Sequence, residues 1–144
     1  MILGYVTDEV KDKIIAGEGC LGLVYSGEAG KAIEEKDTLK YAIPQNGTIY
    51  CVDAMVVPKA AENKAGAEAF INFMQRPDIA ARNAKETYYG ITNTEGLNLL
   101  PDEVKNNKGL YPDSAVLDAS EMLRSEGSIN QKYLDIWNEI TAAN

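Results

Sequence analysis

The segment of residues 48–57 constrains the fold most, because it is apolar at nearly every position. It follows the turn dipeptide Asn46-Gly47 and is closed by Pro58, so the pattern predicts a buried strand. Its one charged residue is Asp53. An ionised carboxylate in such a run is costly unless it is paired or faces a cleft. Asp53 is therefore either a structural residue, bonded by backbone amides at a bend, or a binding residue, and composition leaves both open.

Two other apolar runs, residues 21–25 and 39–43, also predict strands. Helices are predicted around them from one-faced apolar spacing and from end signals such as Gly17, Asn63 and Pro77. The predicted helices cover residues 8–16, 30–35, 64–74 and 77–85, short segments after 92, 101 and 112, and a last helix that includes 133–140. This order predicts an α/β fold with a small sheet flanked by helices.

Composition excludes several classes of function. The 144 residues carry a net charge of −8, which argues against nucleic-acid partners and is compatible with a cationic ligand. There is no histidine, so Ser-His-Asp hydrolases and histidine-bearing zinc sites are excluded within this chain. Cys20 and Cys51 are too few for a disulfide framework, and we expect them to be buried free thiols. No cofactor is implied.

The loop of residues 26–30 is rich in small residues and opens a helix. Its backbone amides could hold an anion, or the loop could be a plain turn. Glu28 would repel a phosphate, whereas a carboxylate beside Tyr25 suits an amine. Tyr25, Tyr50, Tyr88 and Tyr89 are either ordinary core residues or the aromatic walls of a site for an ammonium group.

An ordered set of short segments carries a family resemblance. The segments are Gly17-Glu18, residues 21–27, 41–47 and 52–58, Asn63-Lys64, residues 70–74, Arg76-Pro77-Asp78, Tyr89 with Asn93, Leu110-Tyr111-Pro112 and residues 133–137. In this order they resemble the C-terminal portion of bacterial periplasmic spermidine/putrescine-binding proteins. That resemblance implies part of a type II-like fold with two lobes and a ligand cleft between them. Residues 1–53 would belong to the second lobe, 54–88 would return to the first, and 89–144 would pack back on the second.

The resemblance also implies roles for single residues. Asp53 matches a carboxylate that anchors an amine of the ligand, Tyr25 an aromatic that packs along the methylene chain, and Tyr89 a tyrosine that lines the cleft. Ser26 and Glu28 lie in the site loop and are added to the set. The family has a further aromatic at the position of Cys51, where adjacent Tyr50 could serve, and a glutamine at the position of Leu123.

The implied protein is the solute-binding component of an ABC importer. It would deliver a polyamine to a permease at the membrane, in the periplasm or outside the cell, and it would not be an enzyme. Its export signal or anchor would come from sequence outside residues 1–144, because Met1 to Lys13 is acidic and amphipathic.

Two alternatives remain: a protein of the same fold for another small solute, such as an anion, and a small enzyme with Asp53 and Glu28 as paired carboxylates. The apolar stripe of Phe70, Ile71 and Met74 also predicts that the chain either self-associates or refolds that segment onto the rest of the chain.

Overall fold

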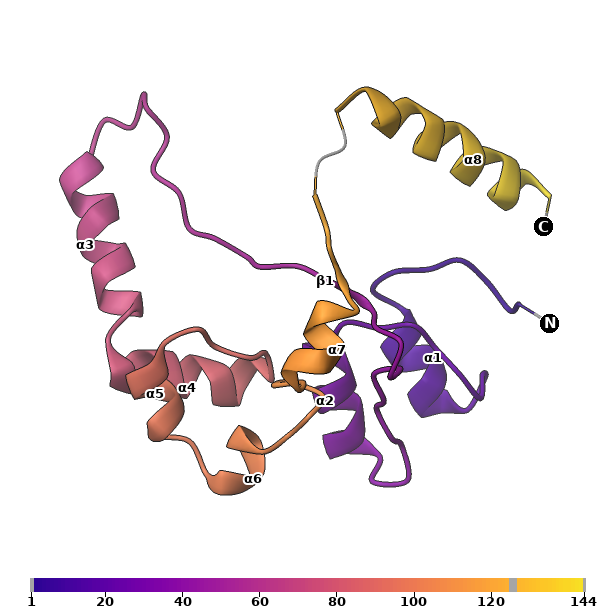
Figure 1. Cartoon of the computed structure of the whole chain (residues 1–144), viewed down its shortest axis with the longest axis horizontal. Coiled ribbons are helices and arrows are strands. Elements are labelled where there is room, and N and C mark those ends of the chain that lie inside the picture. Colours follow the sequence, from indigo (N-terminus) through magenta and orange to yellow (C-terminus); the bar gives the residue numbers. More distant parts are fainter. Residues whose placement is uncertain (1, 125–126, 144) are drawn as a thin grey trace.

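The computed structural model describes residues 2–124 and 127–143, and it is helix-rich with a small sheet, which confirms the predicted α/β class (Figure 1). The elements are α1 (Val10–Ala16), α2 (Ser26–Glu35), β1 (Ile49–Tyr50), α3 (Lys64–Met74), α4 (Pro77–Thr87), α5 (Thr94–Asn98), α6 (Asp102–Lys105), α7 (Ser114–Asp118), β2 (Glu121–Met122), the 3-10 turn η1 (Gly127–Ile129) and α8 (Asn130–Ala142). None of the described helices combines the length and the apolar character needed to span a bilayer.

Local end signals set most helix boundaries. Gly17 ends α1 with a φ of 79°, a left-handed conformation that glycine adopts without a steric penalty. The Asn63 side chain accepts a hydrogen bond from the Gly66 amide at 2.9 Å and so caps α3. Pro77 occupies the first turn of α4. These three predictions are confirmed, whereas the predicted loop of residues 26–30 is instead the first part of α2.

The sheet has only two short strands among the described residues. β1 and β2 pair in parallel, with Ile49 opposite Glu121 and Tyr50 opposite Met122. The expected strands at 21–25 and 39–43 are wrong, and the strand expected from residue 48 onward is reduced to β1. A strand needs a neighbouring edge for its backbone groups, and in the described residues these segments have no such neighbour.

The same lack of neighbours exposes residues that were expected to be buried. The Leu21 side chain is 94% exposed. Cys20 and Cys51 are free thiols, but both are exposed, so the expectation of buried thiols is wrong. Both cysteines lie next to or within apolar runs that the described chain leaves uncovered, which accounts for the error.

A small core lies where α4 meets α5. Leu100 is 3% exposed and packs with Ala81 and Ala84 of α4. Partly buried Ile91 and Val104 surround this cluster. A second contact joins α1 to α2. The helices joined by these two contacts, α1 with α2 and α4 with α5, form the body of the molecule, and the candidate site lies on this body.

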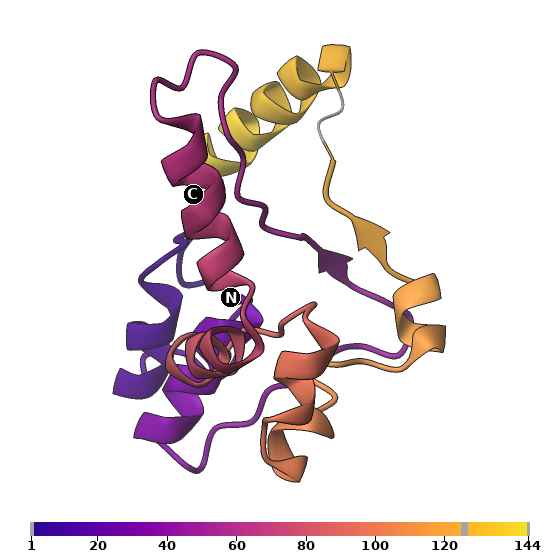
Figure 2. The ribbon, with the colours of Figure 1, turned by 90° about the vertical axis from the view of Figure 1, so that its left-hand side faces the viewer.

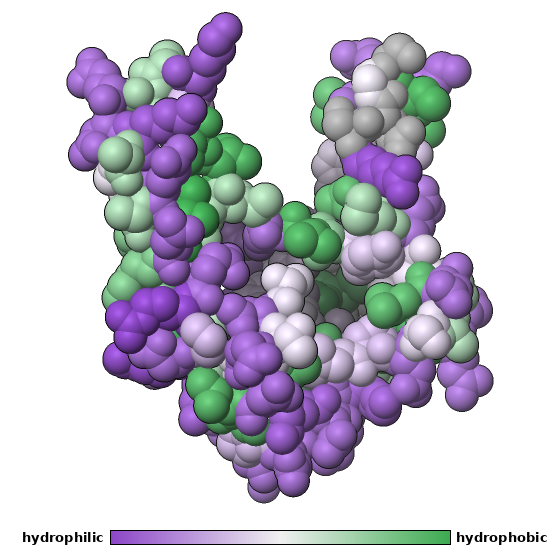
Figure 3. All heavy atoms as spheres, turned by 60° about the vertical axis from the view of Figure 1, so that its left-hand side comes forward, coloured by the Kyte–Doolittle hydropathy of each residue, from purple (hydrophilic) through white to green (hydrophobic). Residues whose placement is uncertain are grey.

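Two parts of the chain extend away from this body. In Figure 1, α3 stands on the left and α8 at the upper right, each away from the other helices, and Figure 2 shows them from another side. Figure 3 shows a hollow between these two arms, with apolar side chains along the inner side of the α3 arm. Large apolar side chains on both arms are exposed, Phe70 at 58% and Trp137 at 49%. The Trp137 ring meets the Tyr5 ring edge to face, with 5.3 Å between centroids.

Candidate functional site

Tyr89 lies with its ring against the start of α2. Gly27 in the first turn of α2 is buried, and a Cβ at that position would collide with the Tyr89 ring. One helical turn later, a Cβ on Gly30 would lie 2.7 Å from the Tyr88 Cβ. The two glycines of α2 therefore form a flat face that receives two consecutive tyrosines from the end of α4.

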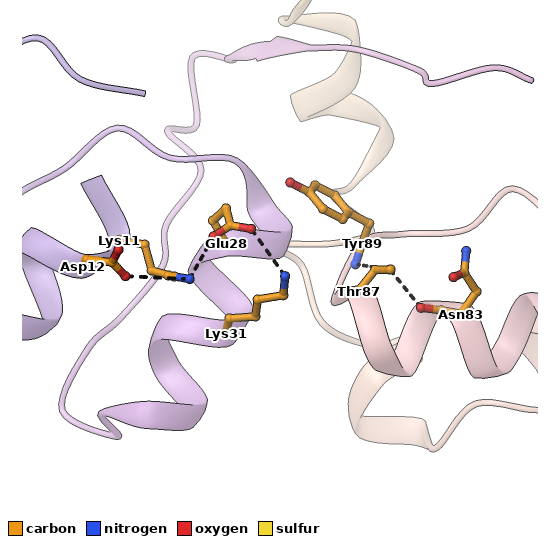
Figure 4. Close-up of polar contacts among 7 residues, drawn as sticks. All are labelled: Lys11, Asp12, Glu28, Lys31, Asn83, Thr87 and Tyr89. Atoms are coloured by element: carbon orange, nitrogen blue, oxygen red, sulfur yellow. Dashed lines mark hydrogen bonds and ion pairs between the residues drawn. The ribbon is translucent and has the colours of Figure 1, made fainter. Parts of the chain in front are cut away.

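The backbone around Thr87 holds Tyr89 in this position. Tyr88 caps the C-terminus of α4 with a φ of 60°, which costs a non-glycine residue about 1–2 kcal/mol and must be offset by its packing. The Thr87 hydroxyl donates a hydrogen bond to the Asn83 carbonyl at 2.9 Å, and it accepts a weak one from the Tyr89 amide at 3.5 Å (Figure 4). These contacts at the end of α4 therefore fix the position of the Tyr89 backbone.

The electrostatics of Tyr89 identify its neighbours. Partial burial raises the pKa of the Tyr89 phenol, and the negative charges of Glu28 and Asp53 raise this pKa further. Tyr25 and Cys51 contribute in the same direction. Charge effects fall off with distance, so the carboxylates of Glu28 and Asp53 are near enough to act on the Tyr89 phenol.

Asp53 lies in the irregular segment after β1 and is exposed. Together with Met55, Ile71 and Gln75 it lines an open recess of about 400 Å³. No hydrogen bond or ion pair to its carboxylate is found within the part of the chain that the structure describes. The structural explanation for Asp53, a carboxylate bonded by backbone amides at a bend, therefore has no support here.

Glu28 is already paired with two lysines. Its Oε2 lies 3.4 Å from the Lys11 Nζ, and its Oε1 lies 3.5 Å from the Lys31 Nζ (Figure 4). The hydrogen bond and charge of Glu28 raise the pKa of Lys11. The spacing of Glu28 and Lys31 on one helix could have predicted the second pair. Lys11 gave no such signal, because it reaches Glu28 only through the packing of α1 on α2.

The remaining predicted residues are placed less centrally. Tyr25 precedes α2 as its N-terminal cap and is 60% exposed, so it is not a core aromatic. Ser26 is the first residue of α2. Tyr50 accepts a backbone hydrogen bond from the Leu123 amide at 2.7 Å, and the Leu123 side chain is 62% exposed.

Residues 4–112 match the family model described as bacterial extracellular solute-binding protein. The chain is 31% identical over 141 residues to the spermidine/putrescine-binding periplasmic protein of Salmonella typhimurium, covering 98% of this chain and 40% of that protein. It is 31% identical over 114 residues to a putrescine-binding periplasmic protein of Pseudomonas aeruginosa, covering 78% of this chain and 31% of that protein.

A crystal structure of the substrate-binding protein of a spermidine/putrescine ABC transporter from Streptococcus pneumoniae, in complex with calcium and HEPES, superposes with a TM-score of 0.78. The two are 33% identical, and the match covers 92% of this chain and 41% of that one. The chain thus spans about 40% of the length of the Salmonella typhimurium and Streptococcus pneumoniae proteins. The match confirms that its α/β architecture is that of part of such a binding protein.

Proposed function

Because this chain belongs to the family of bacterial extracellular solute-binding proteins, we propose that it forms part of an interlobe cleft for a polyamine such as spermidine or putrescine. The bound amine would be delivered to the permease of an ABC importer. The relatives named above support this ligand class. The observation that carries the proposal is the exposed carboxylate of Asp53, which lines an open recess and has no hydrogen bond or ion pair among the described residues.

The chemistry of these groups suits an alkyl diamine. A carboxylate without a partner can accept charge-assisted hydrogen bonds from an ammonium group, each worth about 1.5–3 kcal/mol. The exposed ring of Tyr25 and the partly exposed ring of Tyr89 offer faces to an ammonium or to methylene groups, each worth about 0.5–2 kcal/mol. Asp53 would therefore anchor one end of the ligand while the tyrosines bind its stem.

Titration calorimetry with putrescine and spermidine tests this proposal. We expect Asp53→Asn to weaken binding by about tenfold to a hundredfold, the range for one lost charge-assisted hydrogen bond. The matched control is Asp37→Asn, which removes the same charge from the loop after α2. Equal binding by the wild type and Asp53→Asn would overturn the role of Asp53. A wild type that binds neither amine would overturn the polyamine proposal.

The expectations about catalysis and location are also proposals. The relatives named above are binding proteins of transporters and not enzymes, and we propose that this protein likewise catalyses no reaction. We propose a periplasmic or extracellular location, which the relatives' names support, and within it a place beside a membrane permease. The division into residues 1–53, 54–88 and 89–144 stays a prediction. An anion as the solute is not favoured, because the relatives are named for amines.

We also propose that two copies of the chain associate through the apolar surfaces of the two arms. The chain exposes 11337 Å², whereas a compact monomer of its mass, 15.7 kDa, exposes about 7,300 Å². Interfaces of permanent dimers bury about 2,000–5,000 Å² in total, or about 1,000–2,500 Å² on each partner, so a second copy can cover a large part of this excess. Light scattering on a sizing column should give a mass of 31.4 kDa, twice that of one chain. A monodisperse monomer that persists when the protein concentration is raised about 100-fold would contradict this proposal.

A further inference from the structure

Lys11 pairs with Glu28, a carboxylate that the proposed cleft could offer to a second ligand ammonium. Glu28 follows Gly27, on which the Tyr89 ring rests, in the first turn of α2. Both of its oxygens are engaged, Oε2 by Lys11 and Oε1 by Lys31. The Glu28 side chain is only 29% exposed and that of Lys11 only 22%, so this pair is screened from water more than the other ion pairs of the described chain.

We infer that Lys11 is a built-in competitor for the ligand's second ammonium group and thereby sets how strongly the cleft discriminates diamines from monoamines. This inference rests on the proposed function and deepens it. A tethered ammonium acts at an effective concentration of about the millimolar range or above, without losing further translational freedom. A free diamine must therefore displace Lys11 before its second ammonium can pair with Glu28.

The surroundings of Lys11 make that displacement feasible. The Lys11 Nζ also lies 3.7 Å from the Asp12 Oδ1, so Lys11 keeps a counter-ion when it leaves Glu28 (Figure 4). Lys31 is on the same helix as Glu28 and is 40% exposed, so it can turn toward solvent. Lys11 instead comes from α1, and its movement away from Glu28 would loosen a contact between two helices. We therefore expect Lys11 to affect ligand binding more than Lys31 does.

The proposed cleft would therefore contain one unpaired carboxylate, Asp53, and one carboxylate already paired with lysines, Glu28. Asp53 would accept the first ammonium of any primary amine. Glu28 would accept a second ammonium only in competition with Lys11. The wild type should therefore prefer putrescine to n-butylamine, which has the same number of carbons and one ammonium, by only a small factor.

Titration calorimetry with putrescine and n-butylamine, on the full 144-residue chain, tests the inference. We expect Lys11→Met to tighten putrescine binding about fivefold to tenfold and to leave n-butylamine nearly unchanged, because only the diamine reaches Glu28. The gain should vanish in the double variant Lys11→Met/Glu28→Gln. The matched control is Lys13→Met on the same helix, whose ammonium pairs with Glu18 at 3.2 Å. Lys13→Met should match the wild type.

The outcomes separate this inference from the proposed function. If the wild type binds putrescine and Lys11→Met binds it no more tightly, Lys11 is no competitor and the inference alone is overturned. The same holds if the gain persists without Glu28. If neither the wild type nor Lys11→Met binds either amine, the proposed function and the inference fail together.

A second measurement follows Lys11 directly. In lysine-labelled protein, nuclear magnetic resonance should show the pKa of Lys11 above the ordinary value of 10.5, since Glu28 stabilises the charged ammonium. Glu28→Gln should bring this pKa back toward the ordinary value. Saturating putrescine should shift the Lys11 side-chain signal in the same direction as Glu28→Gln, and n-butylamine should not. A Lys11 signal indifferent to bound putrescine would overturn the inference.

Discussion

The Tyr89 ring rests directly on the backbone of Gly27, so that two segments more than 60 residues apart meet without an intervening side chain. This contact joins the start of α2 to the end of α4. It places Tyr89 beside the turn of α2 that carries Glu28, and the charges of Glu28 and Asp53 raise the pKa of its phenol. The glycine is therefore a requirement of the site as well as of the packing.

Replacement of Gly27 tests that requirement. Gly27→Ala would put a methyl group where the Tyr89 ring lies, and we expect a loss of about 1–3 kcal/mol in the free energy of unfolding, the usual cost of overpacking. Because the ring must move, putrescine binding should weaken as well. Urea unfolding and calorimetry measure the two effects. Gly4→Ala is the control, since nothing lies within 4 Å of a Cβ there. Equal stability of both variants would contradict the contact.

The ionisation of Tyr89 gives a second prediction. Burial and the carboxylates of Glu28 and Asp53 raise the pKa of Tyr89 above the ordinary value of 10.0. A group with a raised folded pKa contributes stability that is fully present below its unfolded pKa and is lost as the pH rises through its folded pKa. The free energy of unfolding of the wild type, taken relative to that of Tyr89→Phe, should therefore be constant below about pH 10 and fall above it.

A titration of the ring carbon signal of Tyr89 separates the causes of this raised pKa. Glu28→Gln should lower the pKa of Tyr89 part of the way, because burial is the larger cause and remains. Glu103→Gln removes an equal charge from the first turn of α6 and should leave that pKa unchanged. Equal effects of the two variants would mean that Glu28 does not act on Tyr89 at close range.

Which features could be predicted from the sequence depends on the range of the forces involved. Helix ends were predictable because a cap acts within one turn: Gly17, Asn63 and Pro77 each end or begin a helix as expected. Strands were not predictable in the same way. The run at residues 21–25 has the composition of a strand, but in the described chain no edge lies beside it, so its backbone finds no ladder.

The residues of the candidate site differ in the same way, since some could be identified from the sequence and others only from tertiary contacts. Asp53 was identifiable as the one charge in an apolar run, and Tyr25 and Tyr89 were indicated by a family resemblance; their ligand contacts stay predictions. Lys11 was not identifiable, because it lies 17 residues from Glu28 and meets it only when α1 packs on α2. Tertiary contacts of this kind leave no periodic signal in the sequence.

The small core makes a third prediction about stability. Leu100 is 3% exposed and packs on Ala81 and Ala84 of α4, so Leu100→Ala should cost about 2–5 kcal/mol. The neighbouring Leu99 is 57% exposed, and Leu99→Ala should change the free energy of unfolding by less than about 0.5 kcal/mol. Urea unfolding followed by circular dichroism measures both. Equal losses for the two leucines would place the core elsewhere.

Trp137 offers a direct test of association, because it is the one tryptophan of the chain and lies on the exposed face of α8. In a single chain Trp137 is 49% exposed, and its ring contacts Tyr5 edge to face. If a second copy covers α8, the Trp137 emission should shift to shorter wavelength as the protein concentration rises, and should return on dilution.

The Tyr5 contact provides the control for that measurement. Tyr5→Ala removes the ring partner within the chain and leaves the apolar face of α8, including Leu134 and Ile136, in place. It should alter the emission of the dilute protein and keep the concentration-dependent shift. Ile136→Asp should abolish the shift, because a buried unpaired charge at the interface is costly. A shift that survives Ile136→Asp would mean that α8 is not the surface through which the copies meet.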